Sequence, residues 1–134
     1  MGIEYEIDAE LGVIFAVGKG KITAKDISDT ENRWLTDNRF RPGLNLLFDG
    51  RLAHLELSGA DARSLANRDA QELLLEKVCA VVEGGSFGVA RMYQGWAGDK
   101  IAVHVVRDMA SAREWLGLPP EEEQEDRGVQ GNRA

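Results

Sequence analysis

Asp49, Arg51 and His54 lie within one short stretch and are the first candidates for chemistry in the sequence. A carboxylate that orients an imidazole is a general-base arrangement, so Asp49 and His54 could serve a hydrolase-type site. Such a site also needs a nucleophile, and no serine or cysteine is evidently paired with these side chains. We therefore favour a simpler interpretation, in which Asp49 caps loop amides and pairs with Arg51 while His54 is solvated.

A glycine-containing turn before a predicted helix is a candidate anion site. Backbone amides of Gly84, Gly85 and Ser86 would face an anion at the start of that helix. Arg91 or Arg107 would add positive charge. The turn lacks both the P-loop lysine and the full dinucleotide glycine spacing. A tight strand-to-helix turn explains the same residues, and it is the interpretation we favour.

Metal, disulfide and thiol chemistry have little support. Cys79 is the only cysteine, which excludes an intramolecular disulfide and any zinc site that needs two cysteines from one chain. It lies in an apolar stretch and is predicted to be an inert core thiol, because reactive thiols need exposure and positive neighbours. His104 lies between two valines, far from His54 in the sequence, so the pair is a poor metal signature. No metal and no cofactor is predicted.

Hydrophobic periodicity predicts the elements that position these residues. The short apolar run 44–49 is entered through Pro42-Gly43 and left through Asp49-Gly50, which indicates a central strand. Residues 50–57 lack clear periodicity and are predicted to form a loop over its carboxyl end. Ligands and partners gather at that end of the strands in open α/β sheets. The remaining strands are predicted at 3–7, at 13–17 with an end at Gly18 and Gly20, at 78–82 and at 101–106.

Four helices are predicted between and after these strands. Thr23 with Asp26 and Ser58 with Asp61 resemble capping boxes, opening helices that run to about residues 38 and 75. A third helix follows Ser86, and a fourth runs from an Asp108 cap to Gly117. The residues placed on inward stripes are Ile27, Thr30, Trp34, Leu35, Ala62, Leu65, Ala66, Asp69, Leu73, Val89, Met92, Tyr93, Trp96, Met109, Ala112, Trp115 and Leu116. The three tryptophans are predicted to be core, and Tyr93 and Trp96 could also line a small apolar pocket.

This order of elements predicts an α/β fold. Its sheet is five-stranded and mostly parallel, and it opens with an antiparallel hairpin. If successive crossovers step the same way, all helices cover one face. The opposite face, which carries Glu4, Glu6 and Asp8, would be less protected, and a homodimer could cover it.

Composition limits the class of protein. The chain has 134 residues, 43% of them hydrophobic, which suits one domain, and we place it at residues 1–118. The net charge of -7 argues against binding to nucleic acid or to a membrane surface. Residues 119–134 are acidic and lack aromatic side chains, so they are predicted to be a disordered tail. Without a recognisable signal peptide or an apolar run of membrane-spanning length, the protein is predicted to be cytoplasmic, with no membrane insertion.

The order of elements and the residues that punctuate it resemble the SpoIIAA-like family of small STAS-type domains. The resemblance covers about residues 3–118 and rests on the segments 20–23 (Gly-Lys-Ile-Thr), 40–43 (Phe-Arg-Pro-Gly), 46–49 (Leu-Leu-Phe-Asp), 87–92 (Phe-Gly-Val-Ala-Arg-Met) and 112–117 (Ala-Arg-Glu-Trp-Leu-Gly). It implies a β/α fold with helices mainly on one face and no established catalytic activity. Many members of the family are uncharacterised.

One branch of that family, the anti-sigma-factor antagonists, implies a role for Ser58. In that branch a serine before a glycine, at the start of the second helix, accepts phosphate from a partner kinase. Ser58-Gly59 falls at the matching place, but Glu56-Leu57 replaces the Asp-Ser that precedes it in the antagonists. An N-cap role alone explains the identity of Ser58, and we favour it over phosphorylation.

Three classes of function follow from the sequence. The leading one is a non-catalytic interaction or regulatory domain that binds a protein partner or small ligand at the carboxyl edge of the sheet, near Asp49–Ser58, Gly84–Ser86 and Arg107. The alternative is a small-molecule or lipid-like ligand carrier with a pocket among the third and fourth helices. The third, which we favour least, is an enzyme that uses Asp49 and His54.

Overall fold

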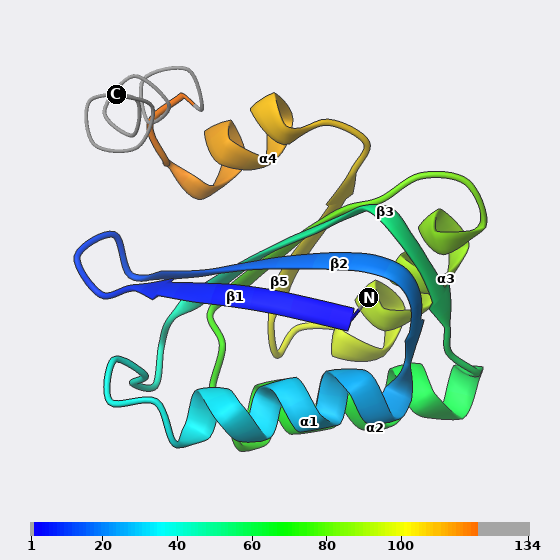
Figure 1. Cartoon of the computed structure of the whole chain (residues 1–134), viewed down its shortest axis with the longest axis horizontal. Coiled ribbons are helices and arrows are strands. Elements are labelled where there is room, and N and C mark those ends of the chain that lie inside the picture. Colours follow the sequence, from blue (N-terminus) through cyan, green and yellow to red (C-terminus); the bar gives the residue numbers. More distant parts are fainter. Residues whose placement is uncertain (1, 121–134) are drawn as a thin grey trace.

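The computed structural model of the chain describes residues 2–120 (Figure 1). Five strands form one sheet in the order β1-β2-β3-β4-β5. Only β1 and β2 pair antiparallel, and every other neighbouring pair is parallel. The strands are β1 (Gly2–Asp8), β2 (Val13–Thr23), β3 (Asn45–Glu56), β4 (Lys77–Val81) and β5 (Ala102–Val106). The predicted α/β fold with its opening hairpin is therefore confirmed.

The four helices begin where the capping residues indicate. They are α1 (Ala24–Leu35), α2 (Gly59–Gln71), α3 (Gly85–Ala97) and α4 (Met109–Leu116). Capping boxes open α1 at Thr23 and α2 at Ser58, and Gly117 ends α4 in the left-handed conformation, as predicted. α1 and α2 end earlier than predicted. After α2, the chain turns through Leu74, whose φ of 52° is incompatible with a continuing helix.

The sheet separates two cores. Ile14, Leu46 and Val78 contribute to the core against α1, α2 and α3, whereas their neighbours Val13, Leu47 and Cys79 pack with α4 on the opposite face. Figure 1 shows α4 across the sheet from α1 and α2. The expectation that all helices cover one face was thus wrong for α4. The first three helices are crossovers between strands, while α4 follows the last strand and has no such constraint.

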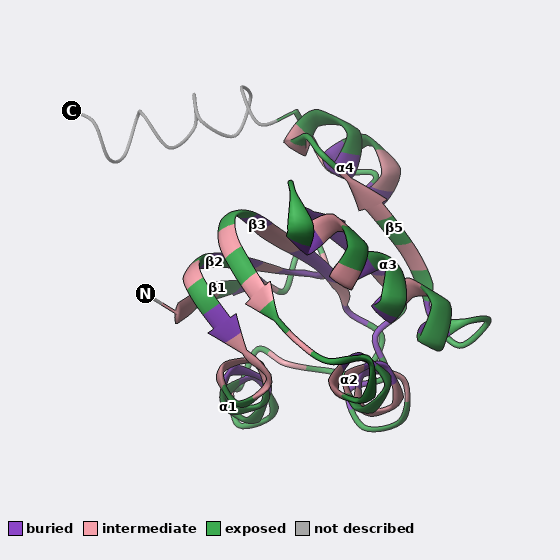
Figure 2. Cartoon of the chain, turned by 90° about the vertical axis from the view of Figure 1, so that its right-hand side faces the viewer, coloured by how far each residue is buried: buried purple, intermediate pink, exposed green. Residues whose placement is uncertain are grey.

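β2 and β3 continue well beyond their predicted ends. After a bulge between Val17 and Lys19, they stay paired from Lys19–Leu52 to Thr23–Glu56, so residues 50–56 form a strand and not the predicted loop. We call this segment, residues 19–23 and 52–56, the β2–β3 ribbon. It bends toward the amino-terminal ends of α1 and α2, into which the two strands lead (Figure 2).

Two glycines that suggested strand ends lie inside these strands. A Cβ on Gly18 would stand 2.9 Å from the Phe48 ring, and one on Gly50 would stand 2.5 Å from it. Both glycines therefore leave space for that aromatic side chain, a use of glycine within strands that resembles a break when only the sequence is read.

Three residues predicted to face inward are exposed. They are Leu35, Met92 and Trp96, and 47% of Trp96 is exposed to solvent. The guanidinium of Arg63 lies 5.0 Å from the Trp96 ring centroid, so this indole covers the outer junction of α2 and α3. Trp34 is a core residue as predicted, and Trp115 is half-buried and stacked on His104.

No helix within residues 2–120 is long and apolar enough to cross a membrane. The predicted acidic tail lies outside the described residues, apart from Pro119 and Pro120.

Candidate functional site

A cavity of about 90 Å³ lies between the sheet and the helices α1, α2 and α3. Its walls are almost wholly apolar. Leu46, Phe48 and Ala80 come from the sheet, and Leu55 comes from the β2–β3 ribbon. The helices contribute Ile27, Leu65, Val89, Ala90 and Tyr93. Of the two residues that could line an apolar pocket, Tyr93 lines this cavity and Trp96 does not. The pocket was expected among the third and fourth helices, which was wrong for α4, since that helix lies across the sheet.

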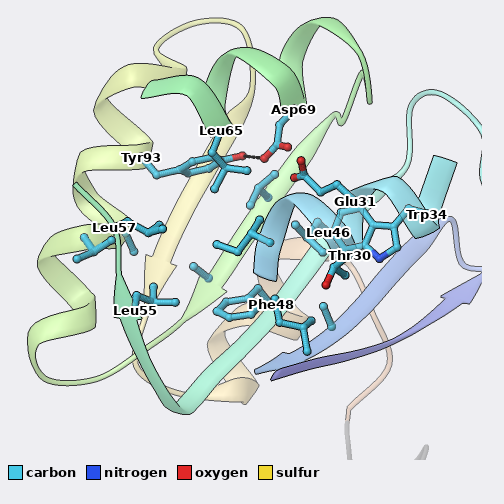
Figure 3. A pocket seen from close by; sticks show the side chains of 17 residues that line it. Thr30, Glu31, Trp34, Leu46, Phe48, Leu55, Leu57, Leu65, Asp69 and Tyr93 are labelled. Atoms are coloured by element: carbon cyan, nitrogen blue, oxygen red, sulfur yellow. Dashed lines mark hydrogen bonds between the residues drawn. The ribbon is translucent and has the colours of Figure 1, made fainter. Parts of the chain in front are cut away.

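Two buried carboxyl groups and a phenol stand at one wall of this cavity. Glu31 and Asp69 are 1% and 2% exposed, and Tyr93 Oη donates a hydrogen bond of 2.6 Å to Asp69 Oδ2. Figure 3 shows the Glu31 and Asp69 carboxyl groups directed toward one another. Burial and the nearby Asp69 raise the pKa of Glu31 far above its ordinary value, and burial also raises the pKa of Asp69. One proton is therefore held between the two groups at neutral pH.

We place that proton on Glu31. Asp69 already accepts from Tyr93, which favours its ionised form, and a protonated Glu31 can donate to it. Glu31 Oε1 and Asp69 Oδ1 have no hydrogen-bond partner among the described residues. The hydroxyl of Tyr93 is held in its neutral form because burial raises its pKa.

Arg68 joins α2 to α1 beside this acid pair. Its Nη2 donates 2.6 Å to Asn32 Oδ1, and its Nη1 contacts Ser28 Oγ at 3.3 Å. Its Nε donates 3.2 Å to Glu72 Oε1 on its own helix. The same Nη1 lies 3.6 Å from Glu31 Oε1, which is an ion-pair distance but too long for a hydrogen bond. The guanidinium is thus occupied at the surface and compensates part of the buried charge.

A second hollow, of about 160 Å³, lies between α1 and α2. It shares four lining residues with the inner cavity: Ile27, Glu31, Leu57 and Leu65. Its remaining walls are largely polar and include Ser28, Ser64 and Arg68. The two hollows therefore lie next to one another, with these four residues between them.

Trp34 is a buried residue of the cavity wall. The residue is 3% exposed and lines the cavity, and its Nε1 has no hydrogen-bond partner among the described residues. A buried donor left without an acceptor costs about 1–3 kcal/mol. Its neighbour Tyr5 meets the indole edge-to-face, with ring centroids 6.1 Å apart, and the Tyr5 hydroxyl donates to Asp37.

The residues predicted from sequence at the sheet edge form a different surface. The guanidinium of Arg51 donates two hydrogen bonds of 2.9 Å to the Asp49 carboxylate, from Nε to Oδ1 and from Nη2 to Oδ2. This pairing lowers the pKa of Asp49. His54 projects from the ribbon near Glu56, at 3.8 Å. Within residues 2–120 no hydrogen bond joins Asp49 to His54, and neither lines the cavity or the cleft. The enzyme hypothesis gains no support from this geometry.

The other predicted site residues have structural contacts. Ser58 Oγ accepts from Asp61 N at 3.0 Å, which is the N-cap role. Ser86 Oγ accepts from Leu55 N at 3.1 Å, so this side chain anchors α3 to the ribbon and is buried. The guanidinium of Arg107 lies 3.9 Å from the Phe87 ring centroid. Gly84 is the N-cap of α3, with a φ of 57°, while Gly85 and Arg91 are exposed. Anion or partner binding at this edge, and phosphorylation of Ser58, stay predictions.

Cys79 is buried, and burial raises its pKa to about 12, in keeping with the predicted inert core thiol. His104 stacks on Trp115 at a centroid distance of 4.9 Å. No group of three or more metal-ligating side chains was found in the part of the chain that the structure describes.

Sequence reasoning missed the acid pair and Trp34 as site residues. One signal was present: Asp69 falls on the inward stripe of its helix among alanines and leucines, where an unpaired carboxylate would be costly. Glu31 gave a weaker signal, as the neighbour of Thr30 on the inward side of α1. Only the packing of α1 against α2 brings the two carboxyl groups together.

Comparison with solved structures identifies the architecture. The chain matches the crystal structure of an uncharacterised protein of the DUF3478 family with a SpoIIAA-like fold, from Shewanella loihica PV-4. The match has a TM-score of 0.61 and 17% sequence identity, and it covers 86% of this chain and 94% of that one.

The chain has a SpoIIAA-like fold. The fold that the resemblance implied is thereby confirmed. At this level of identity the likeness concerns the fold alone. No known family profile and no curated protein matches the sequence. The function of a SpoIIAA-like fold must be argued from its own site.

Proposed function

We propose that this SpoIIAA-like domain is a non-catalytic binding domain that holds a small apolar molecule in the cavity between the sheet and the helices α1–α3. The observation that carries the proposal is the cavity itself, with its apolar walls and an adjoining cleft between α1 and α2. Protein interiors are close-packed, and a hollow of this size forfeits packing energy unless something occupies it.

The size of the hollow limits the ligand. An engineered apolar cavity of about 150 Å³ stays dry and takes benzene. The cavity here measures about 90 Å³, and the cleft beside it adds room toward the surface. The cavity alone is smaller than one that takes benzene, so it matches a short hydrocarbon chain, and a single ring or a longer ligand would also occupy part of the cleft past Leu57 and Leu65.

A binding experiment with cavity-filling variants tests the proposal. The probe is 4-fluorotoluene, followed by ¹⁹F NMR, and native mass spectrometry of gently purified protein looks for a retained molecule. Ala90, on the cavity wall, is replaced by leucine, and Leu57, on the wall shared with the cleft, is replaced by tryptophan. The wild type is expected to bind the probe, and both variants to weaken binding at least about tenfold by steric exclusion.

The matched control is Ala110→Leu, which makes the same substitution as Ala90→Leu at an exposed position on α4, across the sheet. It should bind like the wild type. Circular dichroism checks that each variant is folded, and the partly exposed Leu57 provides a second site if Ala90→Leu does not fold. Equal binding by all folded variants, or no binding by the wild type, would refute the proposal.

A further inference from the structure

The two hollows differ in chemistry, and together they define the class of ligand more closely. The inference rests on the function proposed above. The cavity against the sheet has almost no polar surface, so the part of a ligand that lies there is hydrocarbon. The cleft between α1 and α2 is lined in part by Ser28, Ser64, Asp61 and Arg68. A ligand that occupies both hollows therefore meets apolar walls at one end and polar side chains at the other.

The boundary between the hollows is mainly aliphatic. Three of the four residues that line both are Ile27, Leu57 and Leu65, and each of them is half-buried. A hydrocarbon chain that lies across these side chains keeps apolar contacts along its length. The polar end of the ligand then belongs in the cleft, where Ser28 and Ser64 are exposed to solvent.

Arg68 has its least satisfied nitrogen on the side of the cleft. Its Nη2 and Nε donate to Asn32 and Glu72, neither of which lines the cleft. The contacts of Nη1 are with Ser28 and Glu31, which do line it. These contacts are all 3.3 Å or longer, whereas a guanidinium that binds a carboxylate donates over about 2.7–2.9 Å. Nη1 is therefore the donor that gains most from a ligand anion.

The other ionisable groups around the cleft are compatible with an anion beside Arg68. Glu31 is protonated at neutral pH, because burial and the neighbouring Asp69 raise its pKa to about 11. Asp61 lies about 10 Å before Arg68 along α2, a distance at which salt screens charges near the surface. Glu72 binds Arg68 from outside the cleft and is exposed. Among the residues that line the cleft, Arg68 is therefore the nearest charge to such an anion.

We propose that the ligand is an aliphatic carboxylate, with its hydrocarbon chain in the cavity and its carboxylate in the cleft, where it accepts from Arg68 Nη1. Burial of the chain supplies most of the affinity. The carboxylate sets the orientation of the ligand, and the hydroxyls of Ser28 and Ser64 are further donors within the cleft. Because the cleft reaches the surface, the carboxylate keeps part of its hydration there, which it would lose in the cavity.

Octanoate and octanamide isolate the contribution of the carboxylate. They have the same chain and head groups of nearly the same size, and only octanoate is charged. Isothermal titration calorimetry measures the affinity of both for the wild type and for Arg68→Gln. The matched control is Arg63→Gln, which removes the same charge at an exposed position of α2 outside both hollows. Acetate tests the head group without a chain, and octylammonium tests the chain with the opposite charge.

The ratio of octanoate affinity to octanamide affinity should fall at least about tenfold in Arg68→Gln, the effect of one charge-assisted hydrogen bond. Arg63→Gln should keep the wild-type ratio. Ala90→Leu, which fills the cavity, should weaken the binding of both ligands and leave their ratio unchanged. Octanoate should displace 4-fluorotoluene, because its chain needs the same space, and acetate should not.

The orientation of the ligand is a second measurement. In ¹³C-labelled wild type, the terminal methyl group of octanoate should show nuclear Overhauser effects to the methyl groups of Ala80 and Ala90, which line the cavity. The methylene group beside the carboxylate should show them to Ser64, which lines the cleft. This orientation decides alone if Arg68→Gln does not fold.

The outcomes separate this inference from the function on which it rests. If 4-fluorotoluene, octanoate and octanamide all fail to bind, both fail. If 4-fluorotoluene binds and octanoate does not, the cavity takes apolar molecules and the carboxylate inference is wrong. It is also wrong if folded Arg68→Gln keeps the wild-type ratio, or if the terminal methyl group does not reach Ala80 and Ala90. Tighter binding of octylammonium than of octanoate overturns it as well.

Discussion

At the scale of single residues, burying the carboxyl groups of Glu31 and Asp69 costs folding free energy, and both groups lie at the wall of the proposed ligand cavity. Each carboxyl group is almost fully buried, and Tyr93 and Arg68 offset only part of the desolvation. Perturbed titratable groups in a hollow are typical of functional sites, although structural pairs also show them. Here the pair fixes α1 to α2 at the point where the cleft meets the cavity.

Replacing Glu31 by glutamine should flatten the dependence of stability on pH. The folded state keeps the Glu31 proton far above its ordinary pKa of 4.5, while the unfolded chain loses it near that value. Wild-type stability therefore falls as pH rises above about 4.5, by up to about 1.4 kcal/mol per pH unit. Glutamine can still donate to Asp69 and does not ionise. We expect Glu31→Gln to be more stable than the wild type at pH 8, by about 1–3 kcal/mol, and the difference to shrink toward pH 5.

Urea unfolding from pH 5 to pH 9 measures this effect, and Glu72→Gln is the control. Glu72 contacts the same Arg68 but is exposed, so its replacement should keep the wild-type slope. An unchanged slope of stability against pH in Glu31→Gln would show that Glu31 is ionised in the folded protein.

At the scale of elements, local sequence patterns predicted the helix ends, whereas contacts between segments that are distant in the sequence were missed. Helix caps depend on residues that are close in the sequence. The structure has the caps at Thr23 and Ser58, and the helix end at Gly117, where they were predicted. The course of residues 50–56 depends on Phe48, whose ring fills the space above Gly18 and Gly50. That contact joins two strands, and periodicity within one strand does not reveal it. The candidate site was missed for the same reason, because its polar members come from three helices.

The dependence of the ribbon on the Phe48 ring is testable with Gly50→Ala. The new Cβ would lie 2.5 Å from Phe48 Cε2 and 3.1 Å from Val82 Cγ1, so the ring must shift. We expect a loss of about 1–3 kcal/mol in the free energy of unfolding. In a Phe48→Leu background the obstacle is smaller, and the same substitution should cost clearly less, giving a coupling energy of about 1 kcal/mol.

Urea unfolding of the four proteins of this cycle gives the coupling. Gly59→Ala is the control, since nothing lies within 4 Å of a Cβ at that position, and it should be nearly neutral. An identical cost of Gly50→Ala in both backgrounds would mean that Phe48 is not the residue that requires the glycine.

In the whole molecule, the sheet separates a core that contains a cavity from a core that side chains fill. The face under α1–α3 holds the cavity and the buried acid pair, while the face under α4 is filled by Val13, Leu47, Cys79 and Ala112. A ligand in the cavity should therefore stabilise one side of the molecule more than the other. This asymmetry predicts which elements a bound ligand stabilises, whatever the identity of the ligand.

Amide hydrogen exchange with and without saturating 4-fluorotoluene tests the asymmetry. Binding should slow exchange in α1, in α2 and in the β2–β3 ribbon, because residues of these elements line the cavity and a molecule bound there opposes their local unfolding. Amides of α4, which contact the other core, should change much less. The same measurement on Ala90→Leu, whose cavity is filled, should show no effect of the probe. Equal protection of α4 and α1, or protection confined to α4, would place the ligand outside the cavity and contradict the proposed site.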